Sequence, residues 1–122
     1  MADIIYGVNV NVSKDLLLHS ASASGITADM SVAGLRSNTY VLSSTPTSIS
    51  TAAMTAVGLS FMRNLSSSDS ATCSIGVVSG GSMVPFATLR PGEAAMLRLA
   101  AGASYQATGS QDCRMRVDII EG

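Results

Sequence analysis

Residues 72–93 read TCSIGVVSGGSMVPFATLRPGE, and this stretch decides the fold. Apolar residues alternate with small or polar ones from Thr72 to Ser79, a period of two that is typical of a strand with one buried face. Gly80-Gly81 follows, and two residues that accept a positive φ favour a type I′ hairpin turn into Ser82–Leu89. Arg90-Pro91-Gly92-Glu93 then has Pro and Gly where a type II turn needs them. The stretch predicts two antiparallel strands and a turn into a third.

The same period of two continues on both sides of this hairpin. Further strands are expected over Asp3–Val12, Asp15–Ser20, Ile26–Val32, Val57–Asn64, Ala94–Ala100, Ser104–Thr108 and Cys113–Ile120. Gly25 separates two of these runs, and Ser43–Ala56 can form a loop, an edge strand or one helical turn. About eight to ten short strands with frequent turn signals predict an all-β fold, an antiparallel β-sandwich with a jelly-roll-like arrangement.

The length and composition limit the possible functions. A chain of 122 residues fits a single β-sandwich domain over residues 1–122. Charged residues make up only 12% of it, Trp is absent, and His19 is the only imidazole. Most catalytic and metal-binding constellations therefore lack their residues, and we expect no enzyme, no catalytic or metal site and no cofactor.

Charge and hydropathy exclude two further classes of partner. The formal net charge is −1, which gives no electrostatic footprint for nucleic acid. Ser37–Met62 is uncharged and long enough to span a bilayer, but it is filled with Ser, Thr and Asn, so no membrane segment is expected. Met1–Val12 has no basic region ahead of an apolar core, and we therefore expect synthesis in the cytoplasm without a signal peptide.

The two cysteines, Cys73 and Cys113, lie far apart in the chain without a CxxC spacing or a neighbouring His. This pattern favours two reduced thiols that act as small core hydrophobes, and a disulfide forms only if folding brings them together.

The core must be built from Val, Ile, Leu, Met and Ala with only two Phe. Small β-domains with such a thin core often cover their sheet faces and edges in an assembly. We therefore expect a homo-oligomer, a dimer or a trimer, or a subunit docked on a larger particle.

A set of short motifs resembles small virion proteins of tailed bacteriophages. The set begins with Ile26–Gly34 and continues with Leu59–Leu65, whose sequence is LSFMRNL. Ile75-Gly76 follows, then Met83–Phe86 and finally Leu89–Ala94, whose sequence is LRPGEA. The resemblance covers roughly residues 26–100.

This resemblance implies a structural virion protein, most simply a capsid decoration or cement protein. Such a protein binds the major capsid protein on the outer shell in many copies, so the expected location is the virion surface. A tail, neck or fibre-associated virion protein is one alternative. A receptor- or glycan-binding module is the other, and it predicts a concave patch displaying Tyr6, Tyr40 or Tyr105.

The candidate interface lies in two parts of the chain. Terminal strands are common devices for exchange between subunits, so the N-terminal strand is the first part, and Arg63 with its neighbouring loop is the second. The expected interface residues are Ile4, Tyr6, Val8, Val10, Arg63 and Asn64.

Overall fold

The computed structural model describes residues 2–30, 32–51, 54, 56–110 and 113–122. Over these residues the protein is all-β, with ten strands and no helix. The strands are β1 (Ile4–Lys14), β2 (Leu17–Ala28), β3 (Leu35–Leu42), β4 (Thr47–Ser48), β5 (Val57–Asn64), β6 (Cys73–Ser79), β7 (Ser82–Leu89), β8 (Ala94–Arg98), β9 (Tyr105–Gly109) and β10 (Cys113–Glu121). One domain over residues 1–122 was the expectation, whereas the structure divides the chain into two compact units, Met1–Ser31 and Val32–Gly122.

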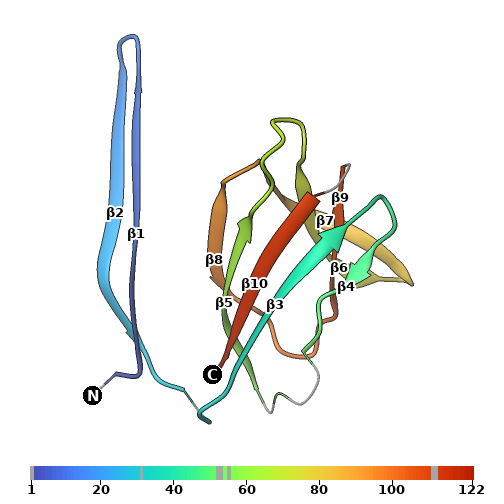
Figure 1. The fold of residues 1–122 in the computed structure, drawn as a ribbon. Helices are drawn as coiled ribbons and strands as arrows, with labels where there is room; N and C mark the ends of the chain where they lie inside the picture. The colour runs from blue at the N-terminus through green and yellow to red at the C-terminus, as the bar shows by residue number, and fades with distance from the viewer. Residues whose placement is uncertain (1, 31, 52–53, 55, 111–112) are drawn as a thin grey trace. The chain divides into compact units, whose positions relative to one another are not determined.

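The first unit is a long two-stranded antiparallel hairpin of β1 and β2 (Figure 1). The sequence pattern predicted two separate strands on either side of Gly25, and this prediction is wrong, because β2 runs through that glycine. Gly25 has φ +64°, and the β1–β2 register shifts between Tyr6 and Val8. The glycine therefore forms a β-bulge, which adds a residue to one strand without ending the pairing.

The second unit is a sandwich of two four-stranded antiparallel sheets (Figure 1). Their strand orders are β3-β10-β5-β8 and β4-β9-β6-β7. The antiparallel pairs are nested, since β3 pairs with β10, β4 with β9, β5 with β8 and β6 with β7. This is the order obtained when one long hairpin is rolled into two sheets, and it is the order of a jelly roll. The predicted all-β sandwich is confirmed.

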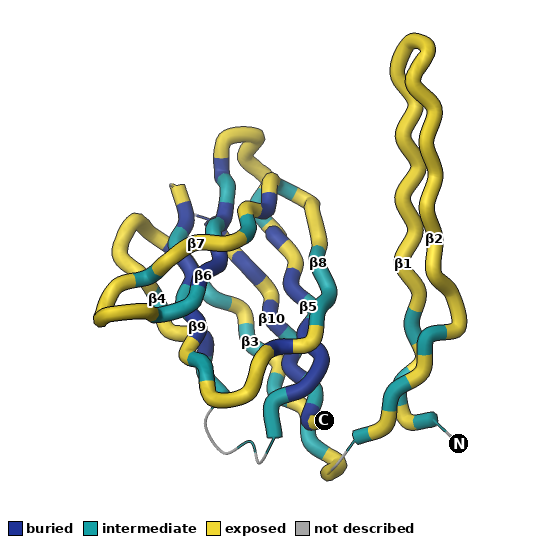
Figure 2. The backbone as a smooth tube through the Cα atoms, turned by 180° about the vertical axis from the view of Figure 1, so that it is seen from behind, coloured by how far each residue is buried: buried dark blue, intermediate teal, exposed yellow. Residues whose placement is uncertain are grey.

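The core lies between the two sheets, where inward-facing residues alternate with exposed ones. On β10, Met115 and Val117 are buried while Arg114 and Arg116 are exposed, as the alternation of a strand requires (Figure 2). Besides β10, residues of β5, β6, β9 and the end of β3 fill the core, among them Leu42, Met62, Ile75 and Ala107. Among the described residues, the fourteen buried members of this cluster include three Leu, three Ile, two Met and two Ala, and Tyr105 is the one aromatic residue among them.

The predicted turns are confirmed. Gly80 and Gly81 have φ +62° and +80°, as a type I′ turn requires. Gly92 has φ +83°, and the amide of Glu93 donates a hydrogen bond to the carbonyl of Arg90 at 3.0 Å. The segment 90–93 is thus a type II turn between β7 and β8.

The strand β3 was not predicted, because its alternation is inverted. Leu35 and Val41 are each 66% exposed, whereas Arg36, Asn38 and Tyr40 are half-buried. A strand that places polar residues inward gives no apolar signal with a period of two. In the segment that follows, Thr47–Ser48 forms the short edge strand β4, while residues 52 and 53 of the possible helical turn over residues 50–54 lie outside the described residues.

Cys73 on β6 and Cys113 on β10 form a disulfide, with Cα atoms 6.5 Å apart and both residues fully buried. The expectation of two reduced thiols is therefore wrong. The chain reverses several times between the two positions, and only the packing of the two sheets brings them together. The disulfide links one sheet of the sandwich to the other.

Candidate interaction surfaces

The hairpin has one continuous apolar face. In its register Val8 lies opposite Ala23 and Val10 opposite Ala21, and directly opposite residues share a face of the ribbon. The apolar face, as we call it, consists of Ile4, Tyr6, Val8, Val10, Val12, Ala21, Ala23, Ile26 and Ala28, and it ends toward the tip with His19, which lies opposite Val12. Four of the expected interface residues, Ile4, Tyr6, Val8 and Val10, therefore lie together on it.

The hairpin itself does not bury this apolar face, whose residues are all exposed or half-buried. Val8 is 53% exposed and Val10 49%, while Ile4 and Tyr6 are half-buried (Figure 2). The opposite face is polar, with Asn9 opposite Ser22 and Asn11 opposite Ser20 in the register. Strands that separate apolar from polar residues in this way normally have the apolar side against a core.

The tip of the hairpin is also apolar. Leu16 is 100% exposed, and Leu17 and Leu18 are 60% and 76% exposed. Asp15 precedes them in the turn with φ +53°, and His19 lies opposite Val12. His19 is exposed, as expected for a surface or interface histidine.

The second surface is the outer face of the β3-β10-β5-β8 sheet. Arg63 lies directly opposite Arg116 in the β5–β10 register, and Arg114 lies two residues before Arg116 on the same side of β10. All three are exposed. We call these three residues, together with Asp118 and Ser37, the arginine face.

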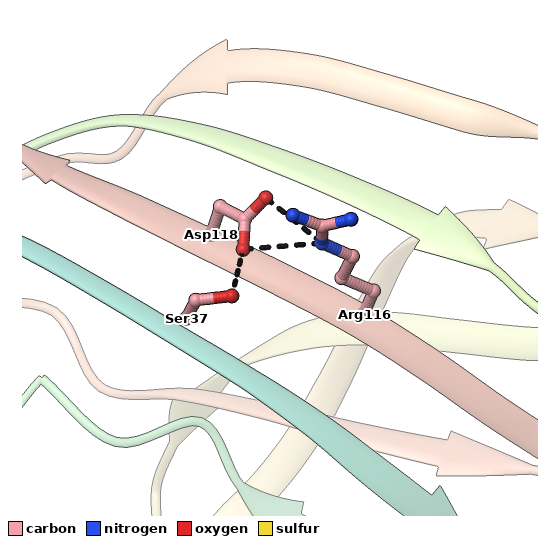
Figure 3. Close-up of polar contacts among 3 residues, drawn as sticks. All are labelled: Ser37, Arg116 and Asp118. Carbon is pink, nitrogen blue, oxygen red and sulfur yellow. Dashed lines mark hydrogen bonds and ion pairs between the residues drawn. The ribbon is translucent and has the colours of Figure 1, made fainter.

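Asp118 bonds with two neighbouring residues of the arginine face, Ser37 and Arg116 (Figure 3). Its carboxylate accepts a hydrogen bond from the hydroxyl of Ser37 on β3 and forms an ion pair with Nε of Arg116 at 3.0 Å. Of the three guanidinium groups on this face, that of Arg116 is paired with the one carboxylate. Like charges directly opposite each other destabilise a sheet, so an acidic partner would offset a cost that the arginine face imposes on the isolated fold.

Asn64 was expected to be an interface residue, and this expectation is wrong because Asn64 is fully buried. Its Nδ2 donates hydrogen bonds to the carbonyls of Ala71 at 2.8 Å and Leu89 at 3.0 Å. Its Oδ1 accepts a hydrogen bond from the amide of Ser66 at 2.9 Å. The side chain therefore fixes the loop after β5 and the end of β7.

The tyrosines of the sandwich are used internally. Tyr105 is 7% exposed, and its hydroxyl donates to the carbonyl and accepts from the amide of Ala100. Tyr40 is half-buried, and its hydroxyl accepts a hydrogen bond from the amide of Ser50. Tyr6 belongs to the hairpin unit. Two of the three tyrosines thus lack the exposed ring and free hydroxyl that a glycan-stacking patch needs.

A shallow hollow lies over the outer face of the other sheet, with a volume of about 540 Å³. It is lined by Pro46, Ser74, Gly81, Ser82, Met83, Pro85, Gln106 and Thr108. Its polar groups are hydroxyls and one amide, without a charged side chain among the lining residues.

Within residues 2–30, 32–51, 54, 56–110 and 113–122, no group of three or more His, Cys, Asp and Glu could hold a metal ion. In the same part of the chain, no helix has the length and apolar character needed to cross a membrane.

Comparison with known proteins gives no relative. No family model matches the chain, and neither the curated proteins nor the solved structures contain a match. The function proposed below therefore rests on the two surfaces and on the motif resemblance.

Proposed function

We propose that the protein is a structural virion protein of a tailed phage, most simply a capsid decoration or cement protein. It would bind the major capsid protein on the outer shell in many copies and stabilise the shell, after synthesis in the host cytoplasm. The observation that carries this proposal is the exposed apolar face of the hairpin. A single chain of this size gains nothing from an uncovered amphipathic ribbon, whereas an assembly buries it.

The resemblance to phage virion proteins supports the proposal in a specific way. Two of its motifs, LSFMRNL and LRPGEA, meet in space at Asn64. The amide of Asn64 donates to the carbonyl of Glu93 at 3.0 Å, and the amide of Gly92 donates to the carbonyl of Asn64 at 2.9 Å. The two motifs are therefore joined by backbone hydrogen bonds within the sandwich. Such contacts are expected when a resemblance reflects a shared fold and not an active site.

The arginine face supplies a docking surface for the shell. Three exposed Arg side chains with only one carboxylate on the same face fit an acidic protein surface, because each guanidinium group can pair with carboxylates in a fork geometry. Weak contacts of this kind add up when many copies are held in register by one lattice.

Copy number tests the proposal. The chain would be quantified against the major capsid protein in purified particles of the proposed phage, by mass spectrometry with isotope-labelled peptides. A decoration protein is expected in hundreds of copies, and particles without the chain are expected to release their contents at a lower temperature. A handful of copies would overturn the decoration role and favour a tail, neck or fibre position, while absence from particles would overturn any virion role.

A further inference from the structure

The edges of the hairpin are as open as its apolar face. The strands β1 and β2 form a two-stranded sheet, so each has one edge whose backbone N–H and C=O groups face no neighbouring strand of that sheet. Proteins protect such edges with Pro, with charge, with a bulge or with a cover. Ile4–Ala28 contains no Pro, and its Lys and Asp residues are confined to the turn at Lys14 and Asp15. Apart from the bulge at Gly25, both edges are unprotected.

The distribution of charge indicates that the partner is another copy of the same ribbon. Between Ile4 and Val12 neither face carries Lys, Arg, Asp or Glu, so two such ribbons can meet along most of their length without burying one of these charges; His19, opposite Val12, lies at the tip end of the apolar face. At the tip each copy has one Lys14 and one Asp15, and neighbouring tips can therefore pair opposite charges. Three pairs of the apolar face also place a large residue of β1 opposite an Ala of β2, as in Val10 opposite Ala21, which lets facing ribbons interdigitate.

The small area of the ribbon indicates that its apolar face and its strand edges both take part in self-association. At about 3.3 Å per residue, β1 is roughly 35 Å long, and two strands are about 10 Å wide. One face therefore covers only about 350 Å² in projection, below the roughly 800 Å² per partner of a standard stable interface. Pairing β1 of one copy with β2 of the next adds backbone hydrogen bonds and leaves no edge open once the ring closes.

We propose that the β1–β2 hairpin is a self-association module in which three copies of the chain close a six-stranded barrel. The apolar face lines its interior, and Asn9, Asn11, Ser20 and Ser22 face solvent. Two hairpins would supply only four strands, too few to enclose these side chains, so three is the smallest closed number. The proposal does not depend on the virion role, because it concerns only contacts between copies of this chain.

Sedimentation velocity of the full chain tests the proposal with a matched pair of variants. Val10→Asp places a carboxylate inside the barrel, whereas Asn11→Asp places the same charge on the next residue, which faces solvent. The wild type and Asn11→Asp are expected to sediment as trimers across micromolar concentrations, and Val10→Asp is expected to fall to one third of that mass. Hydrogen exchange should show the edge amides of β1 and β2 protected in the trimer and exchanging rapidly in Val10→Asp.

Each contrary outcome is informative. A monomeric wild type, or an oligomer that Val10→Asp leaves intact, would overturn the module, since association would then be absent or lie elsewhere. A dimer would overturn the closed ring. Binding of the same proteins to particles separates this inference from the proposed function, because a monomer that decorates shells refutes only the trimer, and a trimer that ignores shells refutes only the virion role.

Discussion

The side-chain amide of Asn64 donates a hydrogen bond to the carbonyl of Leu89 at 3.0 Å, and so joins the end of β5 to the end of β7 in the opposite sheet. The backbone of Asn64 also bonds with the 90–93 turn, through Gly92 and Glu93. One buried residue thus ties together both sheets, the loop after β5 and the turn before β8. An exposed position would have little effect on stability, whereas this one should have a large effect.

Substitution of Asn64 is expected to destabilise the sandwich strongly. Asn64→Ala leaves the carbonyls of Ala71 and Leu89 and the amide of Ser66 without their partner. Each unsatisfied buried group costs about 1–3 kcal/mol, so a total loss of about 3 kcal/mol or more in the free energy of unfolding is expected. Urea unfolding followed by near-ultraviolet circular dichroism measures it.

An isosteric pair of variants separates this role from side-chain size. Asn64→Asp keeps the shape but turns the donor into a carboxylate oxygen that faces two carbonyls, and it should destabilise as much as Asn64→Ala. Asn11→Asp makes the same change at an exposed strand position and should leave the unfolding midpoint unchanged. Equal midpoints for the two Asp variants would contradict the structural role of Asn64.

The disulfide is expected to stabilise the sandwich substantially. Cys73 and Cys113 are separated by 40 residues, and closing a loop of that length lowers the entropy of the unfolded chain by an amount worth about 4 kcal/mol. The Cys73→Ala/Cys113→Ala variant, or addition of a strong reductant, should lower the free energy of unfolding by about that amount. Thiol titration of the protein unfolded without reductant should detect no free thiol, and two thiols per chain would contradict the pairing.

The Arg63→Glu substitution should weaken binding without weakening the fold. It replaces a like-charged pair across β5 and β10 by an attractive one with Arg116, so the free energy of unfolding should stay constant or rise by up to about 0.5 kcal/mol. Cosedimentation with shells of the proposed phage should fall, and the remaining binding should depend less on salt.

Arg90→Glu is the matched control for this prediction, because it makes the same substitution at an exposed position outside the arginine face and the hairpin. Shell binding should survive it. If Arg63→Glu and Arg90→Glu reduced binding equally, the effect would belong to the net charge of the chain and not to the arginine face.

Local chemistry accounts for the parts of the fold that the sequence predicted well. The Gly80-Gly81 and Arg90–Glu93 turns are determined by backbone preferences within four residues, and both are as expected. A glycine with positive φ is compatible both with a break between two strands and with a β-bulge inside one strand. Only the pairing with the distant β1 shows that Gly25 forms a bulge. The inward polar residues of β3 likewise make sense only in the presence of β10, with which it pairs.

The candidate interface was also hard to predict, because it too depends on contacts between residues that are distant in the sequence. The alternation from Ile4 to Val10 correctly indicated a strand with one apolar face, yet no pattern tells what covers that face. Asn64 was expected at the interface only as part of the loop next to Arg63. Its burial results from contacts with Ala71 and Leu89, 7 and 25 residues away, which a sequence pattern does not record.

The division into two units predicts that residues 32–122 fold without the hairpin. The sandwich contains the disulfide, the Asn64 network and the clustered core, all within Val32–Gly122. A chain lacking residues 1–31 should therefore unfold cooperatively with a midpoint close to that of the sandwich in the full chain. An isolated two-stranded hairpin is at best marginally stable in water, so residues 1–31 alone should be unfolded at concentrations too low for self-association. Circular dichroism of both fragments checks this, and a truncated chain without a cooperative transition would show that the sandwich needs the hairpin as part of its own core.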